Sequence, residues 1–349
     1  MTARIRALVV EDSLTVRAHL CQVLAGDPQI EVVGEASDGR RAIELCRELR
    51  PDIVTLDMML PIMSGLAATE YIMAYSPTPI LIVSASTNRG ELFKTYEALA
   101  AGALDVLEKP SPEEPAEDWD RRLVATVKLL AGIKVITHPR ARLARGRRPP
   151  RPDSLSDTRL RPRLLALGAS TGGPAALVEL LRGLPWPFPL PVLVVLHIGE
   201  VFAPAFADWL DGQTQHSVRY PIHGERLPSG PGVLMAPPGR HLVLSGGELL
   251  TTEDPERHSC RPSVDVLFES LAREQGAVVG AALLTGMGRD GAAGLLAIRR
   301  AGGLTVAQDE ATSVVYGMPR EAVLLDAAER VLPLAEIGPF LAEAAGVPV

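Results

Sequence analysis

The chain has 349 residues, of which 47% are hydrophobic and 22% charged, and its net charge is −7. This acidity disfavours nucleic acid as a partner, and no apolar run reaches the roughly 18–20 residues of a membrane span, so we expect no membrane insertion. Cys21, Cys46 and Cys260 have neither disulfide pairing nor metal-ligand spacing, which is typical of a protein in a reducing cytoplasm. The length predicts two or three domains.

Strand-like and helix-like segments alternate in the N-terminal part of the chain. The apolar, β-rich runs are "RALVV", "IEVVGEA", "DIVTLD", "PILIVSA" and "ALDVLEKP". Stretches with helical periodicity, such as "LTVRAHLCQVLAG", lie between them. This alternation predicts a parallel sheet with helices on both faces, whose ligand site lies beyond the carboxyl ends of the strands.

Polar residues follow these predicted strands, namely Glu11 with Asp12, then Asp57, Ser84 and Lys109. Carboxylates that lie close together repel unless a cation is present, and Mg²⁺ is the hard, oxygen-binding ion that suits them. We therefore predict Mg²⁺ at the three carboxylates and Asp57 as a nucleophile toward phosphorus. The Ser84 hydroxyl would hydrogen-bond the phosphoryl group, and Lys109 would pair with its charge.

Residues 1–130 resemble a response-regulator receiver domain, through "VVEDS", "LDMMLPIMSG", "VSAS" and "EKP". The resemblance implies a flavodoxin-like fold and phosphotransfer from a histidine kinase to Asp57. Two positions depart from the usual pattern. Glu11 replaces the commoner aspartate, and Val106 stands where many receivers carry a switch tyrosine or phenylalanine.

The composition changes abruptly at residues 138–163, which hold nine arginines and five prolines. Such a segment cannot bury enough apolar area to fold, and proline with like charges keeps it extended. We predict a receiver domain over 1–134, a flexible linker over 135–162 and a second domain over 163–349.

The second domain begins with "LLALGASTGGPAALVELLRGL", an apolar strand, a glycine-rich turn and an amphipathic helix. Two interpretations compete. Gly168, Ser170 and Gly173 fall one residue short of a dinucleotide phosphate loop. Gly168-x-Ser170-x-Gly172 also fits the sharp strand–turn–helix arrangement that presents a nucleophilic serine beside free N–H groups.

The residues at the ends of two later predicted strands support the interpretation of Ser170 as a nucleophile. His197 follows "PLPVLVVL", and Asp290 follows "VVGAALLTG" in the glycine-rich "LLTGMGRDGAAGL". If the three strands are parallel neighbours, Ser170, His197 and Asp290 can meet, with histidine as base and aspartate as its orienter. Asp290 could instead be the N-cap of a helix over 292–300. His258 could line the site in place of His197.

The motifs "GASTGG", "HSCRPSVDVLFESLA", "LLTGMGRDGAAGL" and "AQDEATSVVYGMPREAV" resemble the catalytic domain of the chemotaxis protein-glutamate methylesterase family. The resemblance implies a doubly wound, mostly parallel α/β domain that needs no cofactor. It implies hydrolysis of glutamyl methyl esters on methylated chemoreceptors, and deamidation of their glutamines. It also places Thr171 at the oxyanion site and Met287 at the adjoining wall. Family members usually read Gln-His-Met-Pro around the histidine, where this chain has Leu196-His197-Ile198-Gly199.

Two other functions remain open for the second domain. It could bind a nucleotide through the glycine-rich turn, or bind a partner protein without catalysis. A DNA-binding output is disfavoured because no basic recognition helix lies outside the linker.

Overall fold

The computed structural model describes residues 4–85, 88–110, 115–133, 135 and 160–348. The chain divides into two compact units, Met1–Arg148 and Pro149–Val349. Most of the predicted linker lies outside the described residues, so its extended conformation and the exact domain boundaries stay predictions. Within the described ranges, no helix combines the length and apolarity that a membrane span needs.

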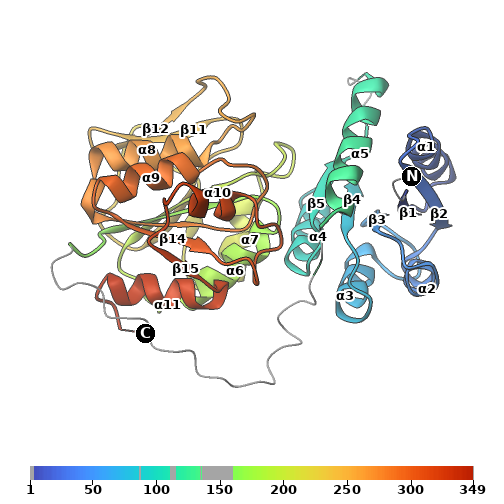
Figure 1. Ribbon diagram of the computed structural model, residues 1–349, viewed down its shortest axis with the longest axis horizontal. Coiled ribbons are helices and arrows are strands. Elements are labelled where there is room, and N and C mark those ends of the chain that lie inside the picture. The colour runs from blue at the N-terminus through green and yellow to red at the C-terminus, as the bar shows by residue number, and fades with distance from the viewer. Residues whose placement is uncertain (1–3, 86–87, 111–114, 134, 136–159, 349) are drawn as a thin grey trace. The chain divides into compact units, whose positions relative to one another are not determined.

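The first unit is a parallel five-stranded sheet in the order β2-β1-β3-β4-β5. Its strands are β1 Ile5–Val10, β2 Ile30–Ala36, β3 Ile53–Leu56, β4 Ile80–Ser84 and β5 Asp105–Glu108. Its helices are α1 Leu14–Ala25, α2 Gly39–Leu49, α3 Gly65–Tyr75, α4 Arg89–Ala100 and α5 Ala116–Ala131. Helix α1 packs with α5, whereas α2, α3 and α4 pack in succession on the other face (Figure 1). This is the predicted flavodoxin-like arrangement.

Local sequence explains where these helices begin. Ser13, Asp38, Ser64 and Asn88 each stand in extended conformation just before a helix. Each side chain accepts a hydrogen bond from a backbone N–H of the first turn, which would otherwise lack a partner. The inner strands β3 and β4 are buried along their whole length because helices cover both faces of the sheet.

The second unit is built on a seven-stranded sheet in the order β15-β14-β13-β6-β7-β10-β8. All of its pairings are parallel. Its strands are β6 Leu164–Ala169, β7 Pro191–Leu196, β8 Val218–Arg219, β10 Gly232–Met235, β13 Val279–Leu283, β14 Leu304–Gln308 and β15 Arg330–Leu332. The predicted doubly wound, parallel α/β fold is therefore confirmed.

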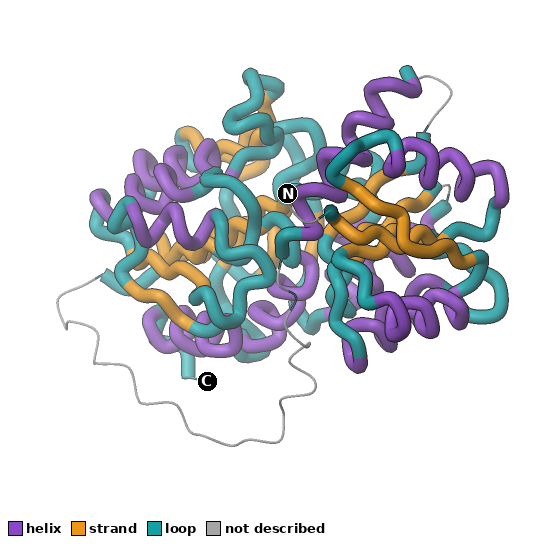
Figure 2. The backbone as a smooth tube through the Cα atoms, turned by 45° about the vertical axis from the view of Figure 1, so that its right-hand side comes forward, coloured by secondary structure: helices purple, strands orange, loops and turns teal. Residues whose placement is uncertain are grey.

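Helices cover both faces of this sheet. They are α6 Gly173–Gly183, α7 Phe206–Gln213, α8 Val264–Glu274, α9 Ala292–Arg300, α10 Met318–Leu324 and α11 Leu334–Ala344, with a 3₁₀ turn at Gly276–Val278. Helices α6 and α11 pack together, and α8, α9 and α10 form the opposite layer. Figure 2 shows the strands of each unit as a layer between its helices.

A small antiparallel sheet was not predicted. It consists of β9 Glu225–Arg226, β11 His241–Ser245 and β12 Glu248–Thr252, in the order β11-β12-β9. The surrounding sequence is polar and turn-rich, yet His241 is fully buried. Its ring nitrogens contact the Ser263 N–H and the Pro255 carbonyl. His241 is therefore a structural histidine.

Candidate functional sites

The predicted phosphorylation residues of the first unit gather at one sheet edge. Glu11, Asp57 and Ser84 are buried, with 1%, 4% and 1% of their surface exposed, while Asp12 is exposed. Lys109 Nζ lies 2.8 Å from Glu11 Oε2 and 2.9 Å from Asp57 Oδ2. The sheet topology thus brings together the strand-end residues that the sequence singled out.

Charge and burial oppose each other at this edge. Burial raises the pKa of Glu11, and the Asp57 charge adds to this, while Lys109 lowers it; the balance is upward. Burial lowers the pKa of Lys109, but the contacts with Glu11 and Asp57 raise it by more, so the pKa lies above its ordinary value and the side chain stays protonated. Lys109 relieves part of the repulsion that we expected Mg²⁺ alone to relieve.

The edge also fits a bound cation and a phosphoryl group. Glu11, Asp12 and Asp57 each offer a carboxylate oxygen within 4.8 Å of the others, which is compatible with one oxygen-liganded Mg²⁺. Among the described residues, the buried Ser84 hydroxyl has no hydrogen-bond partner. A buried hydroxyl without a partner is costly, and a phosphoryl oxygen would satisfy it.

In the second unit, the three predicted catalytic residues follow neighbouring strands. Strand β6 lies between β7 and β13, and all run parallel. Ser170 follows β6, His197 follows β7 and Asp290 lies in the loop after β13. The backbone ties these ends together, because His197 N–H donates to Ala169 O at 3.0 Å and Ser170 N–H donates to Thr285 O at 3.0 Å.

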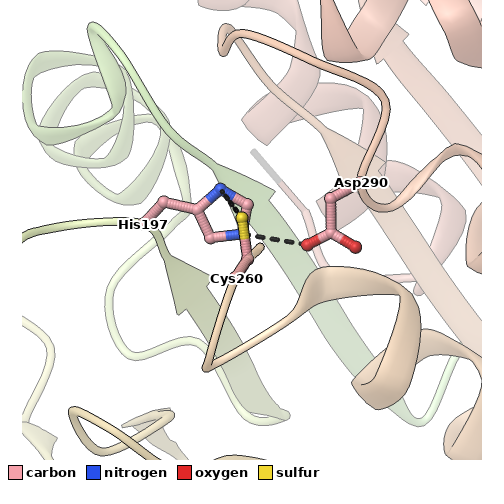
Figure 3. Close-up of side chains that lie close together, drawn as sticks. All are labelled: His197, Cys260 and Asp290. Carbon is pink, nitrogen blue, oxygen red and sulfur yellow. Dashed lines mark hydrogen bonds and ion pairs between the residues drawn. The ribbon is translucent and has the colours of Figure 1, made fainter. Parts of the chain in front are cut away.

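His197 and Asp290 are in direct contact. His197 Nε2 lies 2.9 Å from Asp290 Oδ2 (Figure 3). Asp290 is 2% exposed and the His197 side chain 14% exposed. Because the ionised carboxylate can only accept, Nε2 carries a proton, and in the neutral ring Nδ1 keeps the lone pair. The geometry therefore prepares Nδ1 as the basic nitrogen.

Asp290 also holds the start of helix α8. Its Oδ1 accepts from Ser263 Oγ at 2.7 Å and from Asp265 N–H at 3.2 Å, and its Oδ2 accepts from Val264 N–H at 2.7 Å. A helix N-terminus stabilises an anion. Burial raises the pKa of Asp290, but the His197, Ser263 and Val264 contacts outweigh it and leave the pKa below its ordinary value.

The alternative that Asp290 is the N-cap of α9 is wrong. Gly291 occupies that position, in the left-handed region at φ 89°, and has no side chain that could cap the helix. Instead, the carboxylate of Asp265 in α8 accepts from Gly294 N–H in α9 at 2.6 Å. Asp290, which precedes α9, thus accepts from the first turn of α8, and Asp265 of α8 accepts from the first turn of α9. The two carboxylates together hold α8 to α9.

The pKa of His197 is unusually high for a general base. Burial lowers it, but the contacts with Asp290 and Cys260 outweigh burial and raise it to about 9. A protonated imidazole cannot accept a proton from serine. If His197 is the base that the sequence predicts, activity should rise with pH until the imidazolium has lost its proton.

Cys260 is a neighbour of the site that the sequence did not reveal. Its Sγ lies 3.7 Å from His197 Nδ1 and 3.4 Å from the His258 carbonyl oxygen. In Figure 3 one ring nitrogen of His197 is joined to the Cys260 sulfur and the other to Asp290. The sequence drew attention to this segment only for His258, and an isolated cysteine carries no spacing signal.

His258 belongs to a separate, adjoining network. Its Nε2 lies 3.1 Å from Asp265 Oδ2, and Arg289 Nε donates to its Nδ1 at 3.2 Å. Arg257 lies 3.7 Å from the same Asp265 oxygen and forms a bidentate pair with Glu269. These groups orient Asp265, so His258 supports the site wall and is not placed at Nδ1 of the base.

Ser170 stands on a tight turn beside the loop that carries Asp290. A Cβ on Gly286 would lie 2.8 Å from Ser170 Cβ, so only glycine permits this approach. Gly172 has φ 77° and opens α6. Thr171 and Met287, predicted for the oxyanion site and wall, are half-buried, and Thr285 Oγ1 donates to Thr171 O at 2.9 Å. Within the described residues, no hydrogen bond joins the Ser170 hydroxyl to His197.

Comparison with known proteins agrees with this division of the chain. The family model described as response regulator receiver domain matches residues 7–117. The model described as CheB methylesterase matches residues 165–341, and thus half of the chain. This chain belongs to the CheB methylesterase family. The family expected from the sequence motifs is confirmed.

CheB-family relatives match over almost the whole length. The protein-glutamate methylesterase/protein-glutamine glutaminase 2 of Anaeromyxobacter dehalogenans is 46% identical over 339 residues, 97% of this chain and 96% of that protein. A relative of the same name, numbered 1, from Syntrophus aciditrophicus is 44% identical over 98% of this chain and 99% of its own. The crystal structure of the Thermotoga maritima CheB methylesterase catalytic domain matches with a TM-score of 0.50 and 32% identity, over 53% of this chain and 99% of that one.

Proposed function

We infer that this protein is a phosphorylation-controlled carboxyl ester hydrolase. It removes methyl esters from glutamyl side chains of chemoreceptors and converts receptor glutamines to glutamates. Family membership and the names of its relatives support this activity. The observation that carries the chemistry is the buried His197–Asp290 pair at 2.9 Å, beside the turn that bears Ser170.

The reaction proceeds through an acyl-enzyme. Ser170 Oγ attacks the ester carbonyl while His197 Nδ1 takes its proton, and Asp290 stabilises the resulting imidazolium. The oxyanion forms at the start of α6, beside Thr171, where backbone N–H groups point outward. The imidazolium then protonates the leaving methanol, and water releases the glutamate by the same steps in reverse. With a glutamine substrate, ammonia is the leaving group.

The imidazole is turned relative to the serine proteases. In those enzymes aspartate holds Nδ1 and serine uses Nε2, whereas here Asp290 holds Nε2. The roles of the two nitrogens are exchanged, and the chemistry is the same because one nitrogen donates and the other accepts. A substrate must therefore bring Ser170 to the Nδ1 side of His197.

The receiver domain implies a kinase as phosphodonor, and we propose a histidine kinase that transfers to Asp57. Mg²⁺ held by Glu11, Asp12 and Asp57 would neutralise charge on the incoming phosphoryl group. Lys109 already contacts Asp57, and the Ser84 hydroxyl, which has no partner among the described residues, could donate to the phosphoryl group. We place these events in the cytoplasm, where phosphodonor kinases and the receptors' methylated segments meet. The esterase site needs no cofactor for this chemistry.

Methanol release from methylated receptors tests the esterase. Ser170→Ala and His197→Ala should each lower turnover by on the order of 10⁴-fold with the fold intact. Retention of near wild-type turnover by Ser170→Ala would contradict the assignment. Calorimetric titration with nucleotides distinguishes the esterase from a nucleotide-binding domain, because the esterase interpretation predicts no heat of binding.

Labelling with acetyl phosphate tests whether phosphorylation of Asp57 controls the esterase. Asp57 should accept the phosphoryl group only when Mg²⁺ is present, and Asp57→Asn should block labelling. Treatment with acetyl phosphate and Mg²⁺ should raise methanol release by wild type and leave the rate of Asp57→Asn unchanged. Comparable labelling of Asp57→Asn at another residue would show that the acidic edge was misassigned.

A further inference from the structure

Arg289 is a charged residue of the candidate active-site loop that the proposed mechanism does not use. It lies directly before Asp290, in the loop that follows β13. The same loop approaches Ser170 at Gly286, where a Cβ would lie 2.8 Å from Ser170 Cβ. Arg289 is exposed, whereas Asp290 is 2% exposed. The loop thus carries a cation at the surface of the candidate active site.

The guanidinium group of Arg289 is fixed by a chain of hydrogen bonds. Its Nε donates to Nδ1 of His258 at 3.2 Å. His258 therefore carries its proton on Nε2, which lies 3.1 Å from Oδ2 of the fully buried Asp265. Oδ1 of Asp265 accepts from Gly294 N–H at 2.6 Å. Arg289 is thus linked through His258 to the buried contact between α8 and α9.

The rest of this guanidinium group is available to a ligand. Within the described ranges, no hydrogen bond or ion pair involves the two terminal NH₂ groups of Arg289. Arg257, in the same network, already has the Glu269 carboxylate as a bidentate partner. The planar fork of an arginine matches a carboxylate, and an Nε that is already fixed reduces the rotamer entropy lost on binding. An acidic ligand fits these features.

We propose that Arg289 binds a carboxylate of the substrate next to the ester that Ser170 attacks, so that the enzyme favours acidic segments. The inference rests on the proposed function and names the substrate class of that site. The net charge of −7 repels an acidic segment as a whole, and a local cation offsets this beside the serine. Hydrolysis itself turns a neutral ester into a carboxylate. Where one segment carries several esters, each turnover therefore improves the next substrate.

Binding of two synthetic peptides tests the arginine without chemistry. Each peptide carries one glutamyl methyl ester. The acidic peptide has glutamates one and four residues before and after the ester, which are its neighbours in an extended chain and on a helix; the neutral peptide has alanines there. Fluorescence anisotropy with full-length Ser170→Ala, in acetyl phosphate and Mg²⁺, measures both dissociation constants. The acidic peptide should bind about 5-fold more tightly, the upper end for an exposed ion pair.

A second substitution in the Ser170→Ala protein locates the preference. Arg289→Gln should remove it, and Arg273→Gln should keep it. Arg273 is exposed in the last turn of α8, so its replacement removes the same charge from the same unit. An equal preference in the two double variants, or no preference in Ser170→Ala itself, would overturn the inference.

Methanol release with Ser170 in place shows which constant the arginine changes. Arg289→Gln should raise the ratio of KM for the acidic ester to KM for the neutral ester by about 5-fold. The change should lie in KM rather than in kcat, because the ion pair forms equally in the ground state and the transition state. A fall in kcat that is the same for both esters would refute substrate binding by Arg289. If the peptides bind with the expected preference but wild type releases no methanol, the proposed function fails and the acidic-binding site stands.

Discussion

Replacement of Asp290 by asparagine separates its two tasks, because the side chain keeps its shape and loses its charge. The carboxylate accepts from Ser263 and Asp265 on Oδ1, and from Val264 and His197 on Oδ2. An amide has one oxygen, so one backbone N–H must face its NH₂ group. The bond to Asp265 N–H is the longer, 3.2 Å against 2.7 Å for Val264, and is the one that we expect to be lost.

The expected magnitudes follow from this orientation. One buried N–H without an acceptor costs about 1–3 kcal/mol, and the lost charge at the helix start costs about 0.3–1 kcal/mol. The free energy of unfolding should therefore fall by roughly 1–4 kcal/mol. The amide oxygen still accepts from Nε2, so His197 keeps its tautomer. Turnover should fall on the order of 10²–10³-fold, less than the ~10⁴-fold seen when the tautomer reverses.

Methanol release measured against pH is the assay. Asp290 helps to raise the pKa of His197 to about 9, so the rising limb should move to lower pH in Asp290→Asn. Asp265→Asn is the matched control, since its carboxylate accepts from Gly294 N–H at a helix start. Asp265→Asn should be less stable, while the rising limb of its pH–activity profile should stay at the wild-type pH. Unchanged turnover and an unchanged limb in Asp290→Asn would refute the reasoning, and a loss near 10⁴-fold would refute the amide orientation.

Two further predictions concern the wild-type site and its nearest glycine. For wild type, kcat/KM should rise with pH and level off above about 9, because the imidazolium of His197 is inactive and its pKa is raised to about 9; a plateau already reached near neutrality would contradict this. Gly286→Ala should cost about 1–3 kcal/mol of stability and displace Ser170, since its Cβ would meet Met318 Sδ at 2.3 Å and Ser170 Cβ at 2.8 Å. Thermal unfolding and methanol release measure both effects, with Gly212→Ala, whose Cβ meets nothing within 4 Å, as control.

The strand-end residues could be predicted because a parallel sheet leaves little freedom. Asp57, Ser84, Ser170 and His197 each follow an apolar run, and the carboxyl ends of such runs meet at one edge. Their neighbours along the sheet then follow from the short crossover helices. The same reasoning located Asp290 correctly, but it could not show that this carboxylate serves α8.

Loop residues escaped prediction for a physical reason. Cys260 reaches the imidazole because the chain turns through two non-glycine residues in the left-handed region, His258 at φ 54° and Ser259 at φ 59°. Residues other than glycine rarely adopt this backbone conformation, so the sequence carries no signal for it. The antiparallel sheet of β9, β11 and β12 was missed because β9 is a strand of two residues, too short to show a pattern.

The shared carboxylate makes the first amides of α8 spectroscopic reporters of the proposed catalytic base, His197. The N–H groups of Val264 and Asp265 donate to the Asp290 carboxylate that holds His197, Val264 to the same oxygen, Oδ2, and Asp265 to Oδ1. Their proton shifts in a ¹⁵N-resolved spectrum will follow the charge on the imidazole, although both residues are fully buried. Their exchange with deuterium will slow or quicken as that charge changes. The protonation of an active-site histidine can thus be followed from a helix backbone, in a protein free of any added probe.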